Sequence, residues 1–306
     1  MIPHPIPYQG SKRSLAKHIL PFLPNDVLTL IEPFAGSAAV TIAAAATGRA
    51  SSFHLNDLNA PLMALWHKML EHPGELARKY SDIWEKQLPE PKKYYNQIRA
   101  KFNQTKQPEY LLYLIARCVK ASIRYNPKGE FNQSPDNRRL GREPKRMARD
   151  IFSVSNLLRN RTVLTSTDYK EILRAAHSND VIYMDPPYQG VCSNGDPRYL
   201  SGIAFEQFID ELDSLNHRNI SYILSYDGRT GSKSFGKELT PRLRLHKIEI
   251  DAGRSSQSTL LGRSDNTYES LYLSPALIER LGIPRGKLIK SFTNPKSIQL
   301  DLPITA

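Results

Sequence analysis

The chain has 306 residues, with 42 lysines and arginines against 30 acidic residues and a formal net charge of +12. This length allows one large or two smaller domains, and the basic balance indicates a polyanionic partner, nucleic acid before an anionic membrane. No run of 18 apolar residues is present, so no membrane span is expected, and the N-terminus lacks the charged and apolar regions of a signal peptide. The two cysteines lie far apart and form no disulfide framework, so a reducing cytoplasm is expected.

The first motif is Tyr8-Gln9-Gly10-Ser11-Lys12-Arg13, which precedes an amphipathic stretch at 15–20. A Gly-Ser-Lys sequence before a helix suits an anion, although an ordinary turn explains it equally well. A strand expected at 27–31 then leads through a turn of small residues, Glu32-Pro33-Phe34-Ala35-Gly36-Ser37-Ala38, into an alanine-rich helix at 39–47. Strand, turn and helix form the opening unit of a nucleotide-binding fold, but the turn lacks the G-x-G-x-x-G pattern, which disfavours NAD.

A second strand is expected at 52–55 and ends in Asn56-Asp57. An acidic residue at this point, about 20 residues after the turn, is placed to bind ribose hydroxyls. Asp57 would alternatively cap a helix that begins at Leu58. The spacing favours the ribose role.

Residues 61 to about 160 interrupt the alternation of strands and helices. Helical patterns at 62–71, 74–87, 92–102 and 109–121 precede a hairpin or loop at 124–132. From 117 to 149 the chain holds ten lysines and arginines against three acidic residues, a density that favours a phosphate-contacting surface over an ordinary solvated face. Tyr125 and Phe131 would either stack on bases or form a small core.

The alternation resumes with a strand at 161–165, Asp168-Tyr169, a helix at 170–177 and an apolar strand at 181–184. Asp185-Pro186-Pro187-Tyr188 follows, and its prolines must end that strand. The Asp185 carboxylate and the Pro186 carbonyl are then two rigid acceptors at the sheet edge where ligands bind. Two acceptors beside an aromatic ring suit a flat group carrying an NH2, such as the amino edge of a nucleobase; a capped turn is the alternative.

The remaining chain is expected to give a loop at 189–202 that closes over the site, a helix at 205–215 and strands at 220–226, 244–250 and 269–273. Gly253-Arg254-Ser255-Ser256-Gln257-Ser258 is a polar segment suited to backbone phosphates. Residues 275–306 are interpreted as a peripheral tail without an assigned role.

The order of these motifs resembles the DNA adenine methylase (Dam) family, the α-class, D12-type N6-adenine DNA methyltransferases, from about residue 5 to residue 274. The resemblance implies an α/β fold with a Rossmann-like, S-adenosylmethionine-dependent methyltransferase sheet. It implies a catalytic domain of residues 1–60 and 161–274, an inserted, mainly helical target-recognition domain of residues 61–160, and a tail of residues 275–306.

The resemblance also implies three groups of functional residues. S-adenosylmethionine would be surrounded by Tyr8, Lys12, Glu32, Pro33, Phe34, Ala35, Gly36, Ser37, Asp57, Asp168, Tyr169 and Asp185. Lys12 would pair with its carboxylate, Asp57 with its ribose and Asp168 with its adenine, with Tyr169 on the ring. Catalysis would fall to Asp185, Pro186, Pro187 and Tyr188. With the basic surface included, the residues expected to contact DNA are Arg124, Asn126, Lys128, Asn132, Arg138, Arg139, Arg142, Lys145, Arg146, Arg254, Ser255 and Ser256.

The expected activity is site-specific methyl transfer to N6 of an adenine flipped out of double-stranded DNA, as the modification enzyme of a restriction–modification system. A cognate restriction endonuclease would act independently, and no metal is expected because Cys118 and Cys192 form no ligand spacing. Residues 133–139 replace the Pro-Phe-Gly of many GATC-reading members, so GATC is not expected, and Ala38 replaces a family glycine. A cytosine-N4 enzyme, disfavoured by Asp185, and a catalytically silent DNA-binding protein are the alternatives.

Overall fold

An eight-stranded mixed sheet forms the centre of the computed structural model, which describes residues 2–187, 204–230, 233–235, 239–254 and 266–283. Seven strands follow the order β3-β2-β1-β4-β5-β8-β7, and β6 pairs with β5. Pairing is parallel from β3 to β5 and antiparallel from β5 to β7. The strands are β1 (Thr29–Glu32), β2 (Ser52–Asn56), β3 (Thr162–Thr165), β4 (Val181–Met184), β5 (Ser221–Thr230), β6 (Lys233–Phe235), β7 (His246–Arg254) and β8 (Asn266–Leu273).

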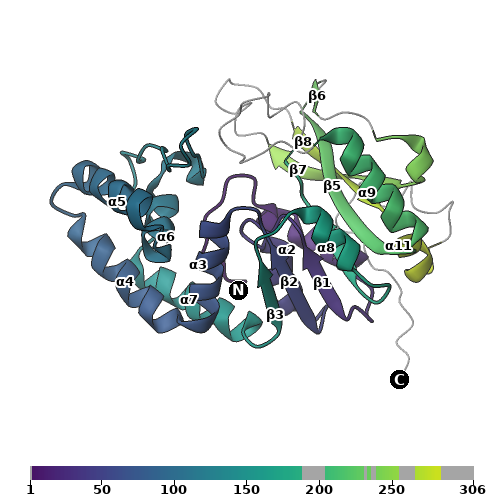
Figure 1. Ribbon diagram of the computed structural model, residues 1–306, viewed down its shortest axis with the longest axis horizontal. Coiled ribbons are helices and arrows are strands. Elements are labelled where there is room, and N and C mark those ends of the chain that lie inside the picture. Colours follow the sequence, from purple (N-terminus) through teal and green to yellow (C-terminus); the bar gives the residue numbers. More distant parts are fainter. Residues whose placement is uncertain (1, 188–203, 231–232, 236–238, 255–265, 284–306) are drawn as a thin grey trace.

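Helices cover both faces of this sheet (Figure 1). The short α1 (Ala16–Ile19) and the helices α2 (Ala39–Ala46), α3 (Ala60–Glu71) and α7 (Pro144–Leu158) belong to one hydrophobic core, whereas α8 (Tyr169–Ala175) and α9 (Phe205–His217) pack in a second core on the opposite face. Alternate strand residues feed the two cores, as Leu30 and Ile31 show on β1. The α/β fold class expected from the sequence is confirmed.

The inserted helices stand at the β3 end of the sheet (Figure 1). They are α4 (Pro73–Lys86), α5 (Pro91–Thr105) and α6 (Pro108–Arg117), and α4 packs against both α6 and α7. Their buried residues, Tyr80, Tyr95 and Phe102 among them, belong to the same core as the first face of the sheet. The insertion therefore extends the core of the sheet instead of forming a separate one.

One helix prediction needs correction, and one helix was not predicted. The fourth predicted helix, 109–121, stops at Arg117 because Cys118 is extended and Lys120 and Ala121 adopt left-handed backbone conformations, with φ of +59° and +50°. Helix α7 was not predicted, although its buried Met147, Ile151, Val154 and Leu158 follow helical spacing.

The predicted tail also begins inside the folded structure. Pro275–Arg280 forms helix α11, which buries Leu277 and Ile278 against the first core and contacts β5. The Arg280 guanidinium lies 3.1 Å from Asp26. The assignment of 275–306 as peripheral is therefore wrong for residues 275–280, while residues 284–306 lie outside the described part. Among the residues that the structure describes, no helix combines the length and hydropathy needed to cross a membrane.

Candidate active site

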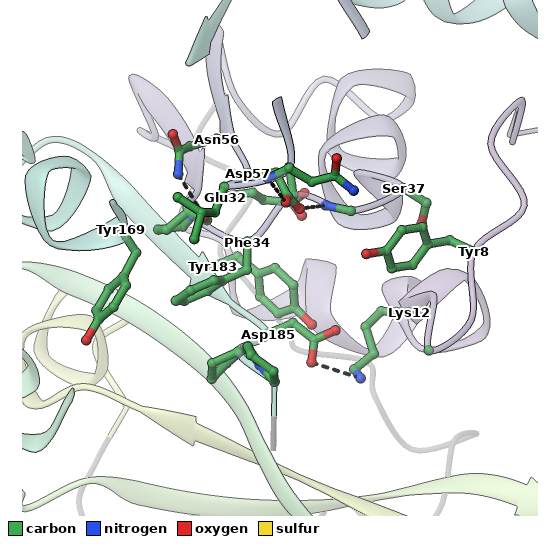
Figure 2. A pocket seen from close by; sticks show the side chains of 18 of the residues that line it. Tyr8, Lys12, Glu32, Phe34, Ser37, Asn56, Asp57, Tyr169, Tyr183 and Asp185 are labelled. Carbon is green, nitrogen blue, oxygen red and sulfur yellow. Dashed lines mark hydrogen bonds and ion pairs between the residues drawn. The ribbon is translucent and has the colours of Figure 1, made fainter. Parts of the chain in front are cut away.

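A cavity of about 300 Å³ opens at the carboxyl ends of β1, β2 and β4. Its volume is at the lower end of the range for small-molecule sites. The cavity is lined by every residue that the sequence assigned to the cofactor, and also by Pro186 and Pro187. In Figure 2, Tyr8, Lys12 and Ser37 lie on one side of the cavity, Tyr169 on the other, and the Asp185 carboxylate points toward Lys12. Parallel strands bring these distant segments together because their carboxyl ends share one edge.

Gly36 is the tightest point of the turn after β1. Its φ is +49°, and a Cβ at this position would lie 3.2 Å from the Tyr8 ring. The Gly36 amide donates to Asp57 Oδ2 at 3.0 Å, and its carbonyl accepts from Trp66 Nε1 at 3.0 Å. Ala38, which replaces a family glycine, keeps a left-handed φ of +47°, a strain of about 1 kcal/mol that the turn tolerates.

Asp57 is held by two backbone amides at the end of β2. Its Oδ1 accepts from Asn59 at 2.9 Å and its Oδ2 from Gly36 at 3.0 Å. Burial raises the pKa of Asp57, and the two amide hydrogen bonds oppose this shift. The cap of α3 is Asn59, whose Oδ1 accepts from the Leu62 amide, so the alternative reading of Asp57 as the helix cap is wrong. Each carboxylate oxygen keeps a lone pair for a ligand.

Lys12 lies between two carboxylates. Its Nζ is 3.0 Å from Asp185 Oδ1 and 3.3 Å from Glu269 Oε2, and only 7% of the lysine side chain is exposed. The sequence assigned Lys12 to the cofactor carboxylate, and that role stays a prediction. Glu269 was not singled out from the sequence, because it sits on an antiparallel strand without a motif.

Aromatic rings and a helix end form the opposite wall. The Tyr169 ring packs 5.2 Å from Phe34 and 6.0 Å from Phe208. Its hydroxyl is buried and finds no hydrogen-bond partner within the described residues, and burial raises its pKa to about 12. Asp168 caps α8 by accepting from the Lys170 amide at 2.9 Å. The wall therefore offers a flat apolar surface beside one fixed carboxylate.

Glu32 has a structural function in addition to lining the cavity. It is 3% exposed, and its Oε1 accepts from the Thr41 amide in the first turn of α2 at 2.6 Å. Burial raises the pKa of Glu32 to about 8, so the carboxyl group is protonated at neutral pH. A cap of this kind fixes the start of α2 behind the turn.

The basic segment at 124–132, predicted as a hairpin or a loop, forms a hairpin. Tyr125 bridges to Phe131, and the Asn126 side chain accepts from the Lys128 and Glu130 amides. Tyr125 and Phe131 are 8% and 1% exposed with edge-to-face rings, so they form a small core and are not free to stack on bases. The Tyr125 hydroxyl donates to Asn59 at 3.2 Å and so connects the hairpin with the cavity wall.

A loop at 136–142, which we name the arginine loop, follows the hairpin. Three buried side chains donate hydrogen bonds to its main-chain carbonyl groups. Arg117 of α6 binds the carbonyls of Asp136 and Arg139, and Tyr80 of α4 binds that of Arg142. Gln87, which follows α4, binds the carbonyl of Leu140. The side chains of Arg138 and Arg139 are exposed. The loop is therefore anchored through its main chain, with two cations facing solvent.

The other predicted DNA contacts fall into three groups. Lys128, Asn132, Lys145 and Arg146 are exposed, as a contact surface requires. Arg142 binds the His4 carbonyl and the Asp150 carboxylate, so its charge is engaged within the protein. Arg124 is half-buried, and its Nε has no hydrogen-bond partner in the described part of the chain.

Some predicted residues lie outside the described residues: Tyr188, the loop at 189–202, Ser255 and Ser256. Arg254 ends β7, where it pairs with Asn266 of β8. Over the described ranges, no group of three His, Cys, Asp or Glu side chains could hold a metal ion. That no metal is required stays a prediction.

A sheet with a nucleotide-sized cavity at its carboxyl edge, an acidic residue after β2 and Asp-Pro-Pro after β4 defines a class of S-adenosylmethionine-dependent methyltransferases that act on amino groups. A sequence model of the D12 class N6 adenine-specific DNA methyltransferases matches residues 8–251, and the chain belongs to this family. The family implies S-adenosylmethionine as cofactor and DNA as substrate.

Individual relatives are distant. The chain is 24% identical over 271 residues to the Type II methyltransferase M1.LlaDCHI of Lactococcus lactis subsp. cremoris, covering 84% of this chain and 90% of that protein. It is 25% identical over 267 residues to the DNA adenine methylase of Serratia marcescens, covering 84% and 93%. It is 22% identical over 284 residues to the Type II methyltransferase M.FokI of Planomicrobium okeanokoites, where the match covers 89% of this chain but only 43% of the relative.

Proposed function

We propose that this protein methylates N6 of one adenine within a short, specific sequence of double-stranded DNA, as the modification enzyme of a restriction–modification system. The observation that carries the proposal is the position of Asp185 and Pro186 in the wall of the cavity, with Lys12 at 3.0 Å from the Asp185 carboxylate. Here the amino group of a base would meet two fixed acceptors.

Methylation of an adenine amino group is difficult because its lone pair is delocalised into the ring. Attack on carbon requires the nitrogen to become tetrahedral and to develop positive charge. Hydrogen bonds from the amino group to the Asp185 carboxylate and the Pro186 carbonyl favour that geometry and stabilise that charge. The two prolines fix the backbone, so the acceptors need little reorganisation during the reaction. The base must leave the duplex to reach this position, at a cost of a few kcal/mol.

The residues of the cavity fit S-adenosylmethionine. The lone pairs that Asp57 keeps suit two ribose hydroxyls, the Phe34 and Tyr169 rings suit the purine, and Asp168 suits its amino group. Any side chain at Gly36 would crowd the Tyr8 ring at the cavity wall. When bound, this cofactor supplies an electrophilic methyl group on a sulfonium. The contribution of the protein is to hold both reactants in line, and positioning of this kind supplies much of the acceleration.

The modification role rests on the relatives and on the basic insertion. The relatives named Type II methyltransferases match most of this chain. The exposed Arg138 and Arg139 on the anchored arginine loop stand where many GATC-reading members have a different sequence, so we propose a recognition sequence other than GATC. Cytosine N4 is the second candidate acceptor, because its amino edge has the same shape; the adenine-specific family disfavours it.

The proposal is tested with purified protein, S-adenosylmethionine carrying a labelled methyl group, and unmethylated genomic DNA. Modified bases are read at single-base resolution, with the Asp185→Asn variant as the control for contaminating activity. N6-methyladenine confined to one short motif supports the proposal and supplies the recognition sequence. N4-methylcytosine would replace the acceptor base, and tight DNA binding without transfer would indicate a catalytically silent core.

A further inference from the structure

Lys12 is a buried cation with more negative charge around it than its own charge requires. Its ammonium contacts Asp185 at 3.0 Å and Glu269 at 3.3 Å, and 7% of its side chain is exposed. A single carboxylate already neutralises an ammonium group, and placing a second one here, with 23% of the Glu269 side chain exposed, adds a partial desolvation cost. The cost implies that Glu269 has a function at this point.

The strand that carries Glu269 holds it rigidly. On β8, Glu269 is opposite Gly228 of β5 on one side and Ile250 of β7 on the other. A β-bulge between Ser225 and Gly228 sets this register, and a Cβ at Gly228 would lie 2.7 Å from the Tyr268 carbonyl oxygen. Only glycine therefore lets β5 approach β8 this closely beside Glu269. An inner strand of the sheet is a precise support for a side chain.

Glu269 acts on the site indirectly. It is absent from the residues that line the cavity, and its Oε2 is buried and faces Lys12. Without the charge of Glu269, Lys12 would lose one of its two carboxylate contacts, and more of its charge would act on Asp185. The Asp185 carboxylate would then be a weaker acceptor for the amino group of the base, and the ammonium would be held less firmly.

We propose that Glu269 is a positioning residue for methyl transfer, which contacts the Lys12 ammonium and shares its charge, so that Asp185 stays both fixed and strongly accepting. The proposal rests on the proposed methyl transfer to adenine. It adds to that function a residue on the antiparallel part of the sheet, outside the motifs that surround the cavity.

The experiment compares Glu269→Gln with wild type in single-turnover methyl transfer at saturating DNA and S-adenosylmethionine. Removing a direct transition-state contact costs about 10² to 10³ in rate, so a residue acting through Lys12 is expected to cost about tenfold. The dissociation constants for DNA and S-adenosylmethionine should change by less than about threefold, because Glu269 does not line the cavity. Glu269→Asp keeps the charge with a shorter reach and should restore part of the rate.

The chain contains a matched control in the inserted helices. Lys79 also lies between two glutamates, 3.0 Å from Glu75 and 2.8 Å from Glu109, and none of these three residues lines the cavity. Glu109→Gln removes an equivalent partner and should leave the transfer rate unchanged. Any loss of stability common to both variants is then separated from an effect on transfer.

A double-variant cycle decides whether Glu269 acts through Lys12. In a Lys12→Gln background, adding Glu269→Gln should change the rate by less than about twofold, since the two residues then no longer interact. A tenfold loss in both backgrounds, or a wild-type rate for Glu269→Gln, would overturn the proposal. If Glu269→Gln fails to fold, an unreduced rate for Glu269→Ala, which also removes the charge, overturns it instead. If the wild-type enzyme yields no N6-methyladenine, the proposed methyl transfer itself is refuted. This outcome is distinct from a failure of the proposal for Glu269.

Discussion

Asp57 offers the sharpest test of how the cavity binds its cofactor. Replacing it by alanine removes both carboxylate oxygens, each of which already accepts one backbone amide at 2.9 or 3.0 Å. We expect the remaining lone pairs to accept the two ribose hydroxyls of S-adenosylmethionine. Hydrogen bonds to a charged group contribute about 1.5 kcal/mol each at the low end, so losing two costs about 3 kcal/mol, or roughly 150-fold in Kd.

Isothermal titration calorimetry with S-adenosylhomocysteine measures this loss, and an analogue lacking both ribose hydroxyls separates it from damage to the turn. Wild-type protein should bind the analogue more than hundredfold more weakly than the parent ligand, whereas Asp57→Ala should bind the two alike. The Gly36 amide also loses its partner in the variant, and this damage to the turn weakens the binding of both ligands equally. A variant that still discriminates the two ligands as strongly as wild type would refute the ribose assignment.

Three further predictions follow from the same geometry. Asp185→Asn should abolish detectable methyl transfer while cofactor affinity stays within about threefold; near-normal turnover would contradict the role of Asp185. Glu32 has a folded-state pKa of about 8 against an ordinary 4.5, so wild-type stability is lost as the pH rises through this interval. Glu32→Gln keeps an acceptor for Thr41 but cannot titrate. From pH 5 to pH 8 its free energy of unfolding in urea, relative to wild type, should therefore rise by up to about 1.4 kcal/mol per pH unit. A difference that stays constant with pH would argue against a buried, protonated Glu32. Replacing Arg138 and Arg139 by alanine should reduce the magnitude of the slope of log K for DNA binding against log salt concentration by about 0.9 per lost phosphate contact. Arg142→Ala should mainly lower the stability of the fold, since its guanidinium binds Asp150. Equal slopes for the two variants would show that the arginine loop does not contact DNA.

The sequence allowed the cavity to be predicted because its residues follow the ends of parallel strands. Glu32 ends β1, Asp57 and Asp185 directly follow β2 and β4, and the ends of such strands meet at one edge. Linear spacing therefore determines three-dimensional proximity in this part of the chain. Glu269 is different, because it lies in the middle of an antiparallel strand whose register depends on a bulge.

The basic segment shows the limit of reasoning from charge. Counting lysines and arginines identified a basic segment but did not distinguish Arg138, which is exposed, from Arg142, which binds Asp150, or Arg117, which is buried. The same charges obscured helix α7, whose apolar face follows helical spacing between basic residues. Which cation is available to DNA depends on packing that no composition records.

The anchoring of the arginine loop also bears on how such a protein changes its target. Arg117, Gln87 and Tyr80 bind only main-chain carbonyl groups of the loop, and every amino acid supplies a carbonyl group. The side chains of residues 137–140 can consequently be exchanged without weakening the anchor. If this loop contacts DNA, as we propose, an anchor that does not depend on the side chains of the loop would let related proteins change these contacts while the cavity stays unaltered.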